Sequence, residues 1–249
     1  MFKGFYNLTS GMLTQQRDLN VVGNNLVNVS TAGFKQDRYT ATTFDQVMYS
    51  RAGNKYKDYE EIGEQSYIRG SSRIYTTYDQ GVIEPTGIRL DFAIEGEGFF
   101  AVQREDGEIV YTRSGSFSLD DEGGLWFSGQ GRVLNPQGQP IQLGTDKITA
   151  DAQGRIFAEN GALLGQLGVY AFEDNGALEH DDQGMFVGEG AALVDSPVIH
   201  WKHLERSNVD MIQQMTEMLT CQRAMQSAAE VSRIYEELMT KAANSVGQL

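Results

Sequence analysis

The residues of this chain that could carry chemistry are a glycine-rich motif and clusters of acids. Residues 96–101 read Gly-Glu-Gly-Phe-Phe-Ala, which superficially matches the fingerprint of a dinucleotide site. That fingerprint opens a helix, whereas strand-like sequence follows here, so we expect no nucleotide. The clusters Asp120–Glu122 and Asp181–Asp182 do not fit the twelve-residue calcium loop with its terminal Glu. Their glycine neighbours predict hairpin turns instead.

Histidine and cysteine offer no stronger site. His180, His200 and His203 share no helical i, i+4 spacing and no nearby cysteine, which argues against a metal centre. Cys221 is the only cysteine, so no disulfide can form within one chain. Paired carboxylates are abundant, which keeps a glycan-acting enzyme as an alternative, but no Ser, His or Cys constellation accompanies them. We therefore predict no catalytic residue, no cofactor and no metal.

The charge is unevenly distributed. The net charge is −14, and residues 81–200, with six basic and twenty acidic side chains, carry all of it. Phosphate binding needs a basic surface, so nucleic acid and anionic membranes are unsuitable partners. No run approaches 18 apolar residues, and polar residues interrupt the N-terminal stretch. We thus expect no membrane insertion and no cleaved signal peptide.

The stretch 81–200 has the composition of an antiparallel all-β domain. It holds most of the glycines, and short apolar runs such as Ile109–Thr112, Leu125–Phe127, Ile141–Leu143 and Ile156–Ala158 alternate with acidic, glycine-rich turns. Many strands at a spacing near ten residues predict antiparallel hairpins. The acids are then mostly solvated turn residues.

The C-terminal segment is expected to be one long helix, from Ser207 to Asn244. It contains no Pro or Gly, and at about 1.5 Å per residue it would reach roughly 55 Å. Apolar residues recur at steps of three or four, the spacing at which helices pack together. From this helix we expect these residues to form assembly contacts: Met211, Met215, Met218, Met225, Val231, Tyr235 and Leu238.

A second helix at the N-terminus is a suitable partner. It is marginal in water unless its apolar stripe is buried, because Gly11 and Gly23 weaken it. The expected assembly residues here are Phe5, Leu8, Met12, Leu19, Val22 and Leu26. We predict an α+β protein whose long N- and C-terminal helices pair as a coiled-coil-like core around a central antiparallel all-β domain.

This reading divides the chain into four segments. They are an N-terminal helical segment (1–35), an extended tyrosine-rich connector (36–80), the acidic β-domain (81–200) and a C-terminal helical segment (201–249). The connector holds seven of the eleven tyrosines, a composition that suits half-buried extended chain or short strands.

Three blocks resemble the bacterial flagellar basal-body rod and hook proteins. Near the N-terminus the matching residues are Asn24, Asn25, Leu26, Asn28, Thr31, Gly33 and Phe34, with Val27 and Ser30 as mild departures. In the middle the resemblance covers Thr86–Val102, and near the C-terminus it covers Ser207–Asp210, Met218, Gln222 and Arg223. The blocks occur in the family's order at both ends and in the middle.

The resemblance implies a structural subunit of the rod, the shaft that joins the motor to the hook, located in the flagellar basal body. It implies a homo-oligomer that also contacts other rod and hook subunits. It further implies passage through the flagellar type III export apparatus. Whether the subunit is proximal or distal stays open. A secreted coiled-coil adhesin with a β-domain is the alternative from another class; it would form a small closed oligomer rather than a tube.

Overall fold

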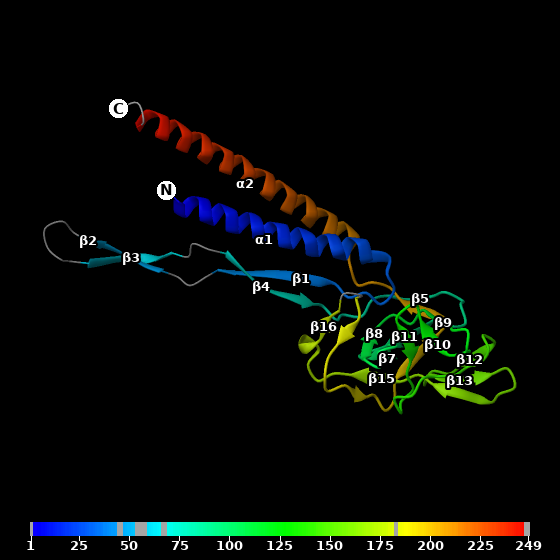
Figure 1. Cartoon of the computed structure of the whole chain (residues 1–249). Coiled ribbons are helices and arrows are strands. Elements are labelled where there is room, and N and C mark those ends of the chain that lie inside the picture. Colours follow the sequence, from blue (N-terminus) through cyan, green and yellow to red (C-terminus); the bar gives the residue numbers. More distant parts are fainter. Residues whose placement is uncertain (1, 44–46, 53–58, 66–68, 182–183, 247–249) are drawn as a thin grey trace. The chain divides into compact units, whose positions relative to one another are not determined.

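The computed structural model describes residues 2–43, 47–52, 59–65, 69–181 and 184–246 (Figure 1). The helical elements are α1 (Phe2–Val27), the 3-10 turns η1 (Asn28–Ser30) and η2 (Asn175–Ala177), and α2 (Met211–Val246). The chain forms two compact units. Unit 1 comprises Met1–Leu26, Asp37–Tyr75 and Met211–Leu249, and unit 2 comprises Val27–Gln36 and Thr76–Asp210. The expected α+β class is confirmed.

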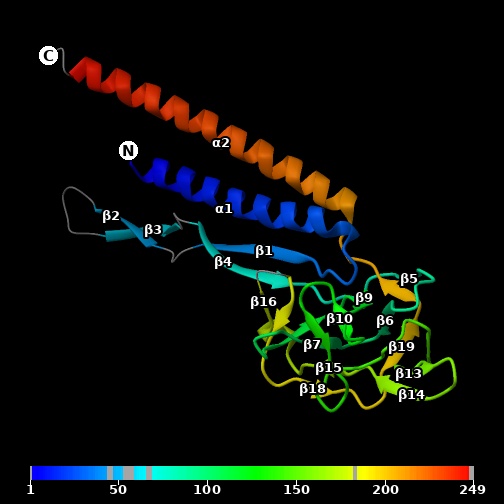
Figure 2. The same cartoon turned by 45° about the vertical axis from the view of Figure 1, so that its right-hand side comes forward.

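Unit 1 contains both long helices and two strand pairs. Its strands are β1 (Asp37–Thr43), β2 (Val47–Ala52), β3 (Tyr59–Gln65) and β4 (Arg69–Thr76). β1 pairs with β4, and β2 pairs antiparallel with β3. Most of the described residues of the tyrosine-rich stretch, which the sequence predicts to be extended chain or short strands, thus lie in strands. Tyr56 and Tyr67 lie outside the described residues. Figures 1 and 2 both show α1 and α2 side by side.

Unit 2 is a β-structure. Its strands are β5 (Ile83–Pro85), β6 (Phe92–Glu95), β7 (Phe99–Gln103), β8 (Ile109–Thr112), β9 (Phe117–Leu119), β10 (Leu125–Phe127), β11 (Gly131–Val133), β12 (Ile148–Ala150), β13 (Arg155–Ala158), β14 (Leu163–Gln166), β15 (Val169–Ala171), β16 (Glu179–His180), β17 (Phe186–Val187), β18 (Ala192–Leu193), β19 (Val198–Trp201) and β20 (His203–Glu205). The largest sheet runs β16-β17-β8-β7-β11-β10-β9, with β15 on β7 and β18 on β15. β12-β13-β14, β19-β6 and β20-β5 form smaller sheets. These pairings are antiparallel, as predicted.

One expected strand is absent from the described residues. Around Ile141–Leu143 there are only isolated β-bridges, from Gln142 to Gly124 and from Pro140 to Leu134. No strand forms, because Pro140 has no N–H to continue a ladder of hydrogen bonds. Ile141 and Leu143 are nevertheless buried in the main core. The side chains that dominate this core are aromatic and branched aliphatic residues, among them Phe92, Phe100, Val102, Leu125 and Ile156.

Helix α2 begins at Met211, four residues later than the sequence suggests. Asn208 does not cap the helix. Instead its Nδ2 donates to the Thr77 carbonyl at 2.8 Å and the Asp79 carbonyl at 3.1 Å, while its Oδ1 accepts from the Gln36 N–H at 2.7 Å. Residues 203–205 form a strand of unit 2. Long-range hydrogen bonds thus override the local capping preference.

A buried carboxylate joins three stretches of unit 2 that are distant in sequence. Glu205 Oε1 accepts from Lys35 Nζ at 2.6 Å, and Oε2 accepts from Arg113 Nε at 2.6 Å. The Gly81 N–H also donates to Oε1, at 2.9 Å. All three charged side chains are buried. Burial lowers the pKa of Lys35 from its ordinary value of 10.5, and the Glu205 carboxylate opposes that shift.

The N-terminal motif ends beside this cluster. The Gly33 N–H donates to the Glu205 carbonyl at 2.8 Å, and Gly33 has φ of 70°. A Cβ at this position would lie 2.3 Å from the Ser114 nitrogen. Both the close approach and the left-handed backbone therefore require glycine. Residues 33–35, 113 and 205 thus form one packed junction within unit 2.

Glu205→Gln is expected to destabilise unit 2 strongly, because it leaves two buried cations without a counter-charge. Breaking such a pair typically costs about 3–5 kcal/mol. Glu84→Gln is the matched control, since Glu84 pairs with Arg206 at the exposed surface and should cost at most about 1 kcal/mol. Chemical denaturation of the two variants followed by circular dichroism makes the comparison. Equal free energies of unfolding for the two variants would show that the buried cluster contributes no more to stability than the exposed Glu84–Arg206 pair.

Candidate assembly faces on the terminal helices

Three contacts fix how α1 and α2 pair within unit 1. Asn25 Nδ2 donates to Gln214 Oε1 at 3.1 Å, and Cys221 Sγ donates to Asp18 Oδ2 at 3.3 Å. Nearer the start of the chain, a Cβ on Gly4 would lie 2.7 Å from the Tyr235 hydroxyl. The residue numbers in each pair add to the same total, as they must when two regular helices run antiparallel without a break. The helices therefore contact each other along most of α1.

The paired faces combine small, polar and apolar side chains. On α2 the protected positions follow a four–three spacing: Gln214, Met218, Cys221, Met225 and Ala228. On α1 the residues at or near the contact are Gly4, Thr14, Asp18, Val22 and Asn25. Asn25 also holds β1, since its Nδ2 donates to the Asp37 carbonyl at 2.7 Å and its Oδ1 accepts from the Asp37 N–H at 3.0 Å. Buried amides of this kind specify a helix register more than they add stability.

The thiol of Cys221 lies inside this contact. Its side chain is only 3% exposed. Burial, followed by the hydrogen bond to Asp18 and the charge of that carboxylate, raises the pKa of Cys221 from 9.0 to about 12. The thiol is therefore a protonated donor at neutral pH.

The predicted assembly residues of α1 fall on two different faces. Val22 is buried within the chain, whereas Phe5 is 41% exposed. Leu8, Met12, Leu19 and Leu26 are half-buried. At 100° per residue, the stripe from Phe5 to Leu26 is centred roughly 100° around the helix from the Asn25 face. The apolar stripe read from the sequence is thus distinct from the face that meets α2.

The predicted residues of α2 divide in the same way. Met218 and Met225 are half-buried toward α1. Met211, Met215 and Leu238 are exposed, Met215 by 43% and Leu238 by 58%, and so are Val231 and Tyr235. Sequence reasoning missed other large exposed side chains on the two helices, namely Tyr6, Leu13, Ile212, Leu219, Ile234 and Met239. A search for a second apolar stripe beside the first would have found most of them.

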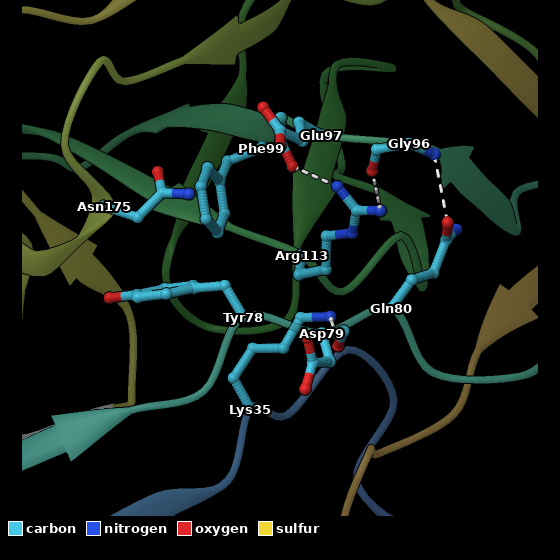
Figure 3. A pocket seen from close by; sticks show the side chains of 10 residues that line it. Lys35, Tyr78, Asp79, Gln80, Gly96, Glu97, Phe99, Arg113 and Asn175 are labelled. Atoms are coloured by element: carbon cyan, nitrogen blue, oxygen red, sulfur yellow. Dashed lines mark hydrogen bonds between the residues drawn. The ribbon is translucent and has the colours of Figure 1, made fainter.

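One of the pockets of unit 2 has a volume of about 260 Å³ and lies beside the Glu205 cluster (Figure 3). Lys35, Arg113, Tyr78, Phe99 and Asn175 contribute to its walls. The Lys35 ammonium in its wall already has partners within the chain, because Nζ donates to the Asp79 carbonyl at 2.8 Å as well as to Glu205. Figure 3 shows the Arg113 guanidinium directed at the neighbouring backbone rather than into open space. The pocket is therefore a by-product of the junction rather than a ligand site.

The glycine-rich motif has a structural explanation. Arg113 donates to the carbonyls of Ile94 at 3.0 Å and Gly96 at 2.5 Å, and also to that of Gly98. The loop thus directs oxygens at a guanidinium, whereas a phosphate site would direct N–H groups at its ligand. The cluster Asp120–Glu122 is a turn as expected: Asp120 Oδ1 accepts from the N–H groups of Glu122 at 2.9 Å and Gly124 at 2.6 Å. In the other cluster Asp181 is ion-paired with Arg104, and Asp182 lies outside the described residues.

In the described part of the chain, no group of three or more His, Cys, Asp or Glu side chains is placed to hold a metal ion. None of its helices is both long and apolar enough to cross a membrane.

Comparison with protein families gives three matches in the order of the chain. Residues 5–35 match the flagella basal body rod protein family, and residues 93–162 match the D1 domain of the flagellar hook protein FlgE/F/G family. Residues 202–245 match the C-terminal region of the flagellar basal body rod FlgEFG proteins. These ranges include much of each block whose resemblance the sequence indicated.

Full-length relatives agree with the family matches. The chain is 31% identical over 264 residues to flagellar basal-body rod protein FlgG of Bacillus subtilis, covering 98% of this chain and 99% of the relative. It is 28% identical to flagellar hook-basal body complex protein FlhO of the same organism over all of both chains. It is 29% identical to flagellar basal-body rod protein FlgF of Rhizobium meliloti, covering 99% of each. The chain therefore belongs to the family of flagellar basal-body rod and hook proteins.

Proposed function

We propose that this subunit self-assembles into a helical tube through the apolar faces that α1 and α2 leave exposed. Family membership makes the chain a structural component of the flagellar basal-body rod, and the family is one of structural proteins rather than enzymes. The mode of assembly is the part that we infer. One observation carries it: with the two helices already paired, large apolar side chains such as Leu13 of α1 and Leu219 and Leu238 of α2 remain exposed.

The energetics favour further burial of these faces. Burying one large apolar side chain gains about 1.5–3 kcal/mol relative to leaving it in water. Leu219, 54% exposed, lies with Met211, Ile212 and Met215 on one stripe of α2. That stripe is centred roughly 135° around the helix from Cys221. A helix that already has one partner along its polar face can thus accept another along its apolar face.

The faces also favour an open assembly. The exposed stripes of α1 and α2 have different residues, so a contact between them on two copies is heterologous. Heterologous contacts generate a helical filament unless the rotation closes into a ring. In the tube we expect the terminal helices, residues 1–35 and 201–249 in the division made from sequence, to form a coiled-coil-like core. The β-domain of residues 81–200 would lie outside it, joined by the connector 36–80.

The proposal includes partners beyond a second copy. Rod and hook relatives share the three matched regions, so the same apolar faces are suited to neighbouring rod and hook subunits. Passage through the flagellar type III export apparatus is consistent with a chain that has one cysteine and no disulfide. An adhesin would instead use its helices to close a small oligomer, and particle shape in electron micrographs separates the two hypotheses.

Leu219→Asp should block incorporation into rods while leaving the monomer folded. The exposed position tolerates a carboxylate in the monomer, but burial in an interface would leave that charge unpaired. Thr220→Asp is the matched control, because Thr220 is the next residue and lies on the polar side of α2. Complementation of a deletion strain, scored by swimming and by counting hook-bearing basal bodies, gives the readout. Normal rods built from the Leu219→Asp subunit would contradict assembly through this stripe.

Val22→Asp is expected to behave differently from Leu219→Asp. Val22 is buried within the chain, so a charge there should loosen the α1–α2 pair in the monomer itself. Circular dichroism of the purified variant should show lost helix and a lower melting temperature. A Val22→Asp monomer with unchanged helix content would place Val22 on an assembly face instead.

Alkylation of Cys221 measures whether the helix pair persists in the free subunit. With a pKa of about 12 in place of 9.0, the thiolate fraction at pH 8 should fall roughly a thousandfold, so iodoacetamide should react correspondingly slowly. The raised pKa also means that the pair loses stability as the pH rises above 9.0, where the thiol of the unfolded chain ionises first. Labelling as fast as in denaturant at pH 8 would mean that the helices separate in the monomer.

A further inference from the structure

A surface patch of unit 2 is built from two segments held together by hydrogen bonds. The N–H groups of Thr86 at 2.8 Å and Gly87 at 3.3 Å donate to the Lys202 carbonyl, and the Lys202 N–H donates to the Asp91 carbonyl at 2.8 Å. The Trp201 indole Nε1 donates to the Arg89 carbonyl at 2.8 Å. The loop after β5 and the junction of β19 and β20 thus form one ordered surface. We call Ile88, Arg89, Trp201 and Lys202 the Trp201 patch.

The backbone of this patch is strained at Lys202. It is the one non-glycine residue with positive φ, at 60°, in the part of the chain that the structure describes. A left-handed conformation costs a residue with a Cβ about 1–2 kcal/mol, and glycine would avoid that cost. The lysine side chain is nevertheless present, and its Nζ lies 4.1 Å from the centre of the Trp201 ring. Strain of this kind tends to occur where a side chain has a function besides folding.

The patch is also the site of two unpaired cations. Among the described residues of unit 2, most lysines and arginines have a carboxylate partner, but Arg89, Lys147 and Lys202 have none. The Arg89 carbonyl and the Lys202 ammonium both contact Trp201, Arg89 is exposed, and the neighbouring Ile88 is 58% exposed. Tryptophan and arginine beside an apolar side chain are the residues enriched at protein–protein hot spots.

We propose that the Trp201 patch binds the acidic surface of unit 2 in a second copy of this chain. The proposal rests on the proposed function, because it adds a lateral contact between β-units to the contact between helices. Charge complementarity selects the occupant. Unit 2 has nine basic and twenty-three acidic side chains, so the surface it offers a neighbouring copy is strongly negative.

Carboxylates suited to this contact are available in the turns of unit 2. Glu105, Asp121 and Glu189 are exposed and have no ion-pair partner among the described residues. An approaching carboxylate would face Arg89 and Lys202, while Ile88 and the Trp201 ring would exclude water around the contact. Such a contact steers association through charge and weakens as salt rises.

Zero-length carbodiimide cross-linking of purified basal bodies tests the proposal. It joins an amine to a carboxylate that is already in contact. The dimer band of this subunit should contain Lys202 linked to an Asp or Glu of residues 81–195, and the monomer band should lack that product. A dimer band without it, from basal bodies whose rods are intact in electron micrographs, overturns the lateral contact. Absence of the subunit from the rods would instead overturn the proposed function.

Two charge-matched variants sharpen the test. Arg89→Glu keeps Lys202 but reverses the charge on the other segment of the patch, so the yield of the Lys202 cross-link should fall severalfold. Lys147→Glu makes the same charge change at an exposed, unpaired cation away from the patch and should leave the yield unchanged. Equal yields in the two variants overturn the role of Arg89 in the contact.

Lys202→Gly supplies an independent readout on the monomer. It removes the ammonium and relieves the left-handed strain, so the melting temperature of the purified subunit should be unchanged or higher. Rods containing this variant should nevertheless lose subunits at lower salt than wild-type rods. A variant that lowers the melting temperature and leaves salt resistance intact would make Lys202 a purely structural residue.

Discussion

The buried carboxylate of Glu205 is the constraint on which unit 2 depends. A carboxylate in the interior is tolerated only when cations and N–H groups replace the water that it has lost. Here Lys35, Arg113 and the Gly81 N–H do so. Each comes from a different stretch of the chain, so the β-unit is complete only when residues from near both helices are in place. The ion cluster thus determines which distant stretches of the chain must pack together, more than it adds to the free energy of unfolding.

The terminal helices pair through polar and apolar contacts together, while several of their large apolar side chains stay exposed. Asn25 and Gln214 hydrogen-bond each other in the buried contact, and a one-residue slip would leave the buried Gln214 Oε1 without its Asn25 donor. The register is therefore well defined. The large side chains, such as Leu219 and Leu238, remain available to other subunits. A helix pair of this type suits a subunit that must be soluble before assembly and must stay bound to its neighbours afterwards.

Sequence reasoning succeeded where the determinants are local. Turn glycines and alternating apolar runs repeat about every ten residues, and they predicted antiparallel strands such as Ile109–Thr112, Leu125–Phe127 and Ile156–Ala158, although not the absence of a strand at 141–143. It failed where a partner is distant. Nothing near Asn208 indicates that its amide binds Gln36 and Thr77 instead of capping α2, and no pattern marks Glu205 as buried. The stripe residues of the helices could be read from their spacing. Their division between an intrachain face and an exposed face could not, because Gln214 and Asn25 are polar residues in buried positions.

The uneven charge is the remaining link between fold and assembly. Acidic turns solve a local problem, because carboxylates such as Asp120 accept backbone N–H groups at tight hairpins. Repeated in every copy, they create another problem, since units of net negative charge repel one another when packed side by side. The apolar faces of α1 and α2 supply attraction along the helices but do nothing for the β-units. A cationic site on each β-unit, placed against the acids of the next, offsets that repulsion locally. Arg89 and Lys202 have the sign and the support at Trp201 that such a site requires, with Arg89 exposed and Lys202 half-buried.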